Sequence, residues 1–146
     1  MQGVFYEDVK KDPKLRLLHP LSPVTWLVYM GTQWDPKSPW ADARVRKAAS
    51  LAIDRKTLAD IFMPGCKPRG NLAMEGDPMG VDFPTDPYDP VQAKKLLAEA
   101  GFPKGFHGGK FYPYQGGYWP YGEQVVTHWK AIGIEVDTVL LDRPAW

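Results

Sequence analysis

The sequence is poor in cysteine and has no excess of charge of either sign. Its 146 residues include one cysteine, Cys66. A single cysteine excludes an internal disulfide framework and any zinc site built on several cysteines. The 18 basic and 17 acidic residues leave a formal net charge of +1, which provides no electrostatic attraction toward nucleic acid or an anionic membrane.

Long apolar runs are also missing. The most apolar stretch, residues 15–30, is interrupted by Arg16, His19 and two prolines, so it is unsuited to span a membrane. The first eight residues contain neither the basic nor the apolar region of a signal peptide. Because the chain also stops directly after a predicted strand, we expect it to be a fragment of a longer protein.

The residues that catalysis or metal binding would need do not form a recognisable pattern. There is no Gly-x-Ser-x-Gly turn and no His-Glu-x-x-His helix. The three histidines, His19, His107 and His128, lack metal-ligand spacing. We therefore expect no enzyme activity, no cofactor and no metal site. A small hydrolase stays an alternative, and it would need His107 or His128 to meet a nucleophile and a carboxylate in one pocket.

Residues 89–100 predict a well-capped helix. Asp89 is a favourable N-cap residue, Pro90 fits the first turn, and Gly101 suits the left-handed conformation that ends many helices. Four apolar positions recur at i, i+3, i+4 and i+7 and so share one face: Ala93, Leu96, Leu97 and Ala100.

The rest of the chain predicts alternating strands and helices. Residues 24–30 are rich in β-branched and aromatic residues and apolar on both faces, which predicts a buried strand. Asp42 is predicted to cap a helix that runs to about residue 52, and Asp54 to cap a second helix that ends at Pro64 and Gly65. Residues 108–114, 121–132 and 134–140 predict a strand, a helix and a strand, which together form a βαβ unit.

Three segments resemble the family 5 extracellular solute-binding proteins, the peptide, dipeptide and nickel receptors of bacterial ABC importers. Residues 40–55 are similar to the family's Pro-Phe-x-Asp-x-Arg-Val-Arg-x-Ala-Leu-x-x-Ala-Ile-Asp-Arg segment, with Trp40 where Phe is usual. Residues 88–106 are similar to its Tyr-Asp-Pro helix, which ends in Gly-Phe-Pro-x-Gly-Phe. Residues 131–136 carry its Gly-Ile-x-Val pattern, and the three segments follow the family's order.

This resemblance implies an α/β fold: a partial lobe of the type II periplasmic-binding-protein-like architecture, with helices packed on a mixed sheet of βαβ units. Residues 1–23 would be a connecting segment near the hinge, and residues 24–146 part of the C-terminal lobe. The implied function is the non-enzymatic, substrate-binding component of an ABC importer. Such a protein binds peptides or similar small solutes in the periplasm or outside the cell and delivers them to a membrane permease.

Aromatic residues are the main candidates for the binding site. Ligands of open α/β sheets usually bind at the carboxyl ends of the strands, and aromatic rings suit pockets for varied organic ligands. We therefore predict Tyr114, Tyr118 and Trp119 as substrate-binding residues. The resemblance adds Tyr29 and Met30, which end the predicted hinge-proximal strand. Alternatively, the aromatic loop is an interaction module that contacts a protein partner through a flat apolar patch.

Overall fold

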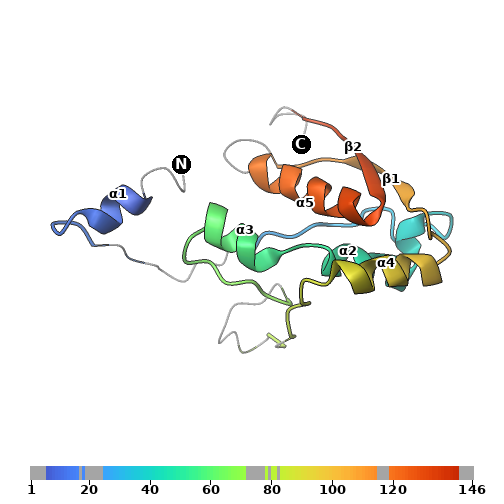
Figure 1. Ribbon diagram of the computed structural model, residues 1–146, viewed down its shortest axis with the longest axis horizontal. Helices are drawn as coiled ribbons and strands as arrows, with labels where there is room; N and C mark the ends of the chain where they lie inside the picture. Colours follow the sequence, from blue (N-terminus) through green and yellow to red (C-terminus); the bar gives the residue numbers. More distant parts are fainter. Residues whose placement is uncertain are drawn as a thin grey trace. The chain divides into compact units, whose positions relative to one another are not determined.

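The computed structural model describes residues 6–16, 18, 25–71, 78, 80–81, 83–114 and 119–141. The chain divides into two compact units, one formed by residues 1–28 and 55–86, the other by residues 29–54 and 87–146. Within the described residues, no helix combines the length and apolarity that crossing a membrane requires. Figure 1 shows the order of the elements along the chain.

In its described residues, the first unit contains two helices, α1 (Tyr6–Lys11) and α3 (Arg55–Phe62). Helix α3 confirms the helix predicted between the cap at Asp54 and the stop at Pro64. It ends before Pro64, and Gly65 adopts a positive φ of 92° that favours glycine. Burial lowers the pKa of the Arg55 guanidinium, and the nearby charge of Asp86 partly opposes that shift.

The second unit is built around a βαβ motif, as predicted. Strand β1 (Phe106–Phe111) and strand β2 (Ile134–Thr138) are parallel neighbours, and α5 (Trp119–Ile132) connects them. The register pairs Phe106 with Ile134 and Phe111 with Thr138. An irregularity between His107 and Lys110 bulges β1.

Two helices of this unit pack side by side, α2 (Ala43–Leu51) and α4 (Pro90–Glu99) (Figure 1). Both begin at the predicted caps, because Asp42 accepts from Arg44 N over 2.7 Å and Asp89 from Gln92 N over 2.8 Å. The buried residues of the two helices are largely small, which permits close approach: Val45, Ala48, Ala49 and Ala93 are all 0% exposed.

A pair of tryptophans forms the centre of the second unit's core. The rings of Trp40 and Trp129 lie 5.3 Å apart, and both are almost fully buried. Trp40 lies in η1 (Pro39–Ala41) and donates its indole N–H to Gly108 O, whereas Trp129 donates to Ala49 O. Because each buried N–H has an acceptor, neither indole carries a desolvation penalty.

The prediction of a buried strand over residues 24–30 is wrong for residues 25–30, which form neither a helix nor a strand. Val24 lies outside the described residues. The side chains of Leu27 and Tyr29 are 55% and 70% exposed. A sequence rich in aromatic and β-branched residues forms a strand only where a neighbouring strand offers hydrogen bonds and a packing surface. In the described residues the sheet consists of β1 and β2. The predicted boundary between residues 23 and 24 stays a prediction.

Candidate functional site

The main candidate site is a hollow of about 490 Å³ at the carboxyl edge of the two-stranded sheet. Its walls come from α5 and from the residues that end and follow β2. Since β1 and β2 are parallel, their carboxyl ends lie at the same edge, where ligands of open α/β sheets usually bind. We call this hollow the carboxyl-edge hollow, and its lining residues are Trp119, Glu123, Val126, Thr127, Thr138 and Leu140.

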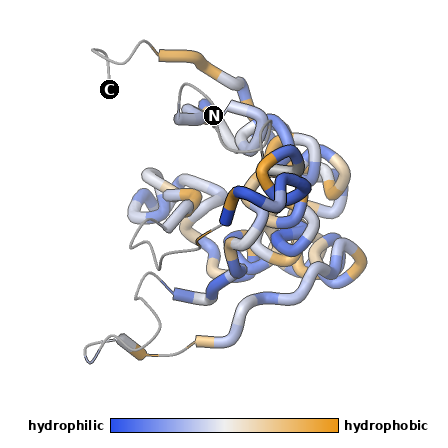
Figure 2. Tube along the Cα trace, turned by 90° about the vertical axis from the view of Figure 1, so that its left-hand side faces the viewer, coloured by the Kyte–Doolittle hydropathy of each residue, from blue (hydrophilic) through white to orange (hydrophobic). Residues whose placement is uncertain are grey.

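The lining of the carboxyl-edge hollow combines apolar and polar groups. Trp119, Val126 and Leu140 supply apolar surface, and Glu123 supplies one carboxylate. The Thr127 hydroxyl donates to the backbone oxygen of Glu123 over 2.8 Å, which leaves its oxygen able to accept. The leucine is 58% exposed, so the hollow is an open wall. Figure 2 shows residues 139–141 as a hydrophobic stretch at the end of the described chain.

The structure brings one of the predicted site residues to this hollow. Trp119 lies in the first turn of α5, because the helix begins two residues earlier than predicted, and its half-buried side chain lines the hollow. Tyr114 follows β1 and is 43% exposed, Tyr29 is exposed, and Met30 is half-buried. These three residues do not line the hollow. Tyr118 lies outside the described residues, and substrate binding by all five residues stays a prediction.

The remaining lining residues were missed, although the sequence contains a signal for some of them. Four lining residues follow one face of α5, because they are spaced at i, i+4, i+7 and i+8: Trp119, Glu123, Val126 and Thr127. Thr138 reaches the hollow through the parallel pairing of β2, which local patterns do not reveal.

The two described histidines lie outside the carboxyl-edge hollow. His107 is exposed, with its Nε2 3.3 Å from Asp137 Oδ1, while its Nδ1 accepts from Gly109 N. His128 packs its ring 5.9 Å from that of Tyr88, and its buried Nδ1 has no hydrogen-bond partner in the described residues. Burial lowers the pKa of His128, with Asp54 opposing the shift. This arrangement gives the hydrolase alternative no support.

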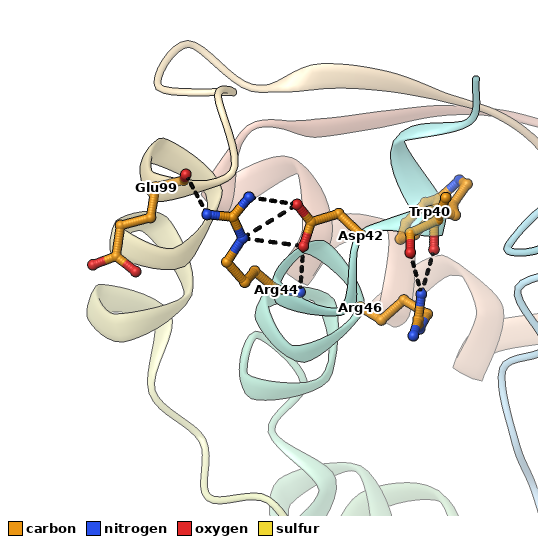
Figure 3. Close-up of polar contacts among 6 residues, drawn as sticks. Trp40, Asp42, Arg44, Arg46 and Glu99 are labelled. Atoms are coloured by element: carbon orange, nitrogen blue, oxygen red, sulfur yellow. Dashed lines mark hydrogen bonds and ion pairs between the residues drawn. The ribbon is translucent and has the colours of Figure 1, made fainter. Parts of the chain in front are cut away.

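Two arginines of the 40–55 motif, Arg44 and Arg46, have structural contacts (Figure 3). Arg44 forms two-pronged contacts with the Asp42 carboxylate, including 2.6 Å between Nη2 and Oδ2, and donates from Nη1 to Glu99 O at the end of α4. Arg46 donates to the carbonyl oxygens of Trp40 and Ala41. The motif therefore joins α2 to α4 and to η1.

Among the described residues, no group of three or more His, Cys, Asp or Glu side chains is arranged to hold a metal ion. The one described cysteine, Cys66, is exposed. The lining of the carboxyl-edge hollow consists of apolar surface, hydroxyls and one carboxylate.

Comparison with known proteins identifies relatives of the chain. It is 34% identical to Heme-binding protein A of Haemophilus influenzae over 103 residues, which cover 67% of this chain and 18% of that protein. It is 34% identical to the Glutathione-binding protein GsiB of Escherichia coli strain K12 over 71 residues, 48% of this chain and 14% of that protein. The chain thus spans less than a fifth of the length of either relative.

The fold is also found in a dipeptide binding protein from Pseudoalteromonas sp. SM9913, solved in complex with Met-Leu. The TM-score is 0.58 at 25% identity, covering 76% of this chain and 23% of that one. This similarity confirms the predicted periplasmic-binding-protein-like α/β fold. Residues 2–146 match the family described as bacterial extracellular solute-binding proteins, family 5 Middle. The chain therefore belongs to the family 5 bacterial extracellular solute-binding proteins.

Proposed function

We propose that the chain is part of the substrate-binding component of an ABC import system and that the carboxyl-edge hollow faces the solute. The observation that carries this proposal is the family match over residues 2–146. The position of the hollow supports it, because solutes of α/β proteins bind at the carboxyl ends of parallel strands. In this proposal residues 24–146 belong to the C-terminal lobe and residues 1–23 connect to it.

Peptides or similar small solutes are the proposed substrate class. The relatives are named for binding heme and glutathione, and the structural relative holds the dipeptide Met-Leu. The carboxyl-edge hollow offers Trp119 and Leu140 to apolar groups of a ligand, and Glu123 to a positively charged group. A wall that mixes these chemistries suits solutes that carry both apolar and polar groups.

The proposed role requires binding and release, with no chemical step. The complete receptor would work in the periplasm or outside the cell and would deliver its solute to an ABC permease. The alternative role is an interaction module built on the aromatic loop, and a flat apolar patch would be the surface expected for it. The concavity beside Trp119 favours solute capture over that alternative.

The test uses the complete receptor that carries this chain. Calorimetry with a panel of di- and tripeptides measures the affinity of the wild type, of Trp119→Ala and of Trp34→Ala. The second variant is the matched control, because Trp34 is 80% exposed and does not line the hollow. We expect Trp119→Ala to weaken binding by roughly tenfold or more, the usual effect of truncating a large aromatic contact. A receptor that binds none of the peptides, or equal losses in both variants, would refute the proposal.

A further inference from the structure

A second hollow, of about 380 Å³, lies at the opposite edge of the sheet, where β1 and β2 begin. Three segments of the second unit build it: α4, the turn between α4 and β1, and the end of α5 with the following glycine. We call it the amino-edge hollow. It is separate from the carboxyl-edge hollow and shares no lining residue with it.

The amino-edge hollow carries charge of one sign. One lysine comes from each of its three segments, Lys94, Lys104 and Lys130, and none of the lining residues is acidic. Within the described part of the chain, none of the three forms an ion pair with a carboxylate. The whole chain has a net charge of only +1. Three like charges around one concave surface raise the local concentration of anions.

Backbone carbonyls at the end of α5 and in the turn after α4 would ordinarily oppose an anion, because helix C-termini carry partial negative charge. Four of the carbonyls that border the hollow already accept backbone N–H groups, which offsets part of that charge. The four bonded carbonyls are those of Leu97, Phe102, Lys130 and Gly133. The three ammonium groups carry the only formal charges among the lining residues.

The hollow also has apolar surface beside the lysines. Leu97 and Ile132 form a buried floor, with 1% and 4% of their surfaces exposed. Phe102 is half-buried and Pro103 is exposed, so both present accessible carbon atoms to the hollow. An occupant that combines a negative group with an apolar body would contact both kinds of surface.

We propose that the amino-edge hollow binds a small organic phosphate monoester. The dianionic phosphate lies among Lys94, Lys104 and Lys130, and the organic group lies against Phe102 and Pro103. Lysine suits this role because its ammonium is a compact charge that binds phosphate without a fixed orientation. The site is independent of solute binding at the carboxyl-edge hollow, so its test and that of the proposed function have separate outcomes.

The test is a titration of this 146-residue chain with phenyl phosphate at constant ionic strength, followed by amide NMR shifts. Gly105 and Gly133 report directly, because both line the hollow. We expect saturable shifts at these amides with a dissociation constant in the millimolar range, weaker shifts with inorganic phosphate, and no saturation with phenol. Higher salt should weaken binding, because the charges are exposed.

Neutral variants provide the matched comparison. Lys94→Gln, Lys104→Gln and Lys130→Gln should each weaken phenyl phosphate binding by roughly two- to fivefold, the scale of single exposed charge contacts. Lys95→Gln is the control, because it removes the same charge from the next position of α4. Lys95 does not line the hollow, and its Nζ lies 4.0 Å from Glu99 Oε1. Lys130→Gln removes a charge from the end of α5 and so could also lower the thermal midpoint of unfolding. In that case the phenyl phosphate affinities of Lys94→Gln and Lys95→Gln are compared, and this comparison decides whether the hollow is the binding site. Equal losses in those two variants, or no saturable shift at either glycine, would overturn the proposal.

Discussion

Trp40 donates its indole N–H to the carbonyl oxygen of Gly108 over 2.8 Å, and the same ring occupies the space that a side chain at Gly108 would need. A β-carbon built there would lie 2.7 Å from the Trp40 ring. The partners are 68 residues apart in sequence, and their contact joins η1 to β1 beside its bulge. The ring also packs edge-on against Phe106, with centroids 5.4 Å apart. Trp40 thus fixes the position of the strand that leads to the carboxyl-edge hollow.

The first prediction concerns the steric part of this contact. Gly108→Ala should lower the free energy of unfolding by about 1–3 kcal/mol, because the added methyl group overpacks a buried ring. In a Trp40→Phe background the same substitution should cost less, since a phenyl ring is smaller than the indole. Urea unfolding of the two single variants and the double variant measures the coupling. Additive losses would show that the ring and the glycine do not constrain each other.

The second prediction concerns the pH dependence that Asp42 confers. Hydrogen bonds from the Arg44 side chain and backbone hold the pKa of Asp42 below its usual range, while burial opposes them. A carboxyl group whose folded pKa is lowered stabilises the fold at pH values above its ordinary pKa of about 4. That stabilisation is lost as the pH falls through the lower, folded value.

Asp42→Asn is the suitable variant, because asparagine still caps a helix but carries no charge. The wild type should be more stable than this variant at pH 7, and the difference should shrink on acidification to about pH 3 and below. Urea unfolding across this range provides the measurement. A difference that stays constant or grows with acid would contradict the prediction.

The third prediction concerns His128, whose pKa is lowered by burial, with a smaller opposing effect of Asp54. The folded state therefore favours the neutral ring, and the unfolded chain binds the proton more readily. Its contribution to stability is complete above the ordinary histidine pKa of about 6.5 and is lost as the pH falls through the lower, folded value. Unfolding midpoints of the wild type should decrease from pH 8 to pH 5.5, and His128→Gln should show a smaller decrease. An equal decrease in both proteins would assign the pH dependence to other groups.

Short sequence patterns predicted those parts of the fold that depend on residues close together in the sequence. Asp42 and Asp89 cap their helices, Gly101 has a φ of 94° after α4, and the βαβ order is present. Contacts between distant segments were not predicted. The Trp40 indole finds its acceptor 68 residues away, and Thr138 meets the α5 face only through parallel pairing. Residues 25–30 show the converse: their strand-like composition did not produce a strand, and the sheet in the described part of the chain consists of β1 and β2.

The last prediction concerns solute binding by the 146-residue chain itself. Tight binding of small ligands normally removes most of the ligand surface from water, whereas Leu140 at the edge of the carboxyl-edge hollow is 58% exposed. The chain also spans only 18% and 14% of the two relatives, so a ligand would meet one wall of a larger site. We expect calorimetry of this chain with short peptides, including Met-Leu, to show weak binding or none. Submicromolar binding by the chain alone would mean that the carboxyl-edge hollow is a complete site, which closes around its ligand without a second lobe.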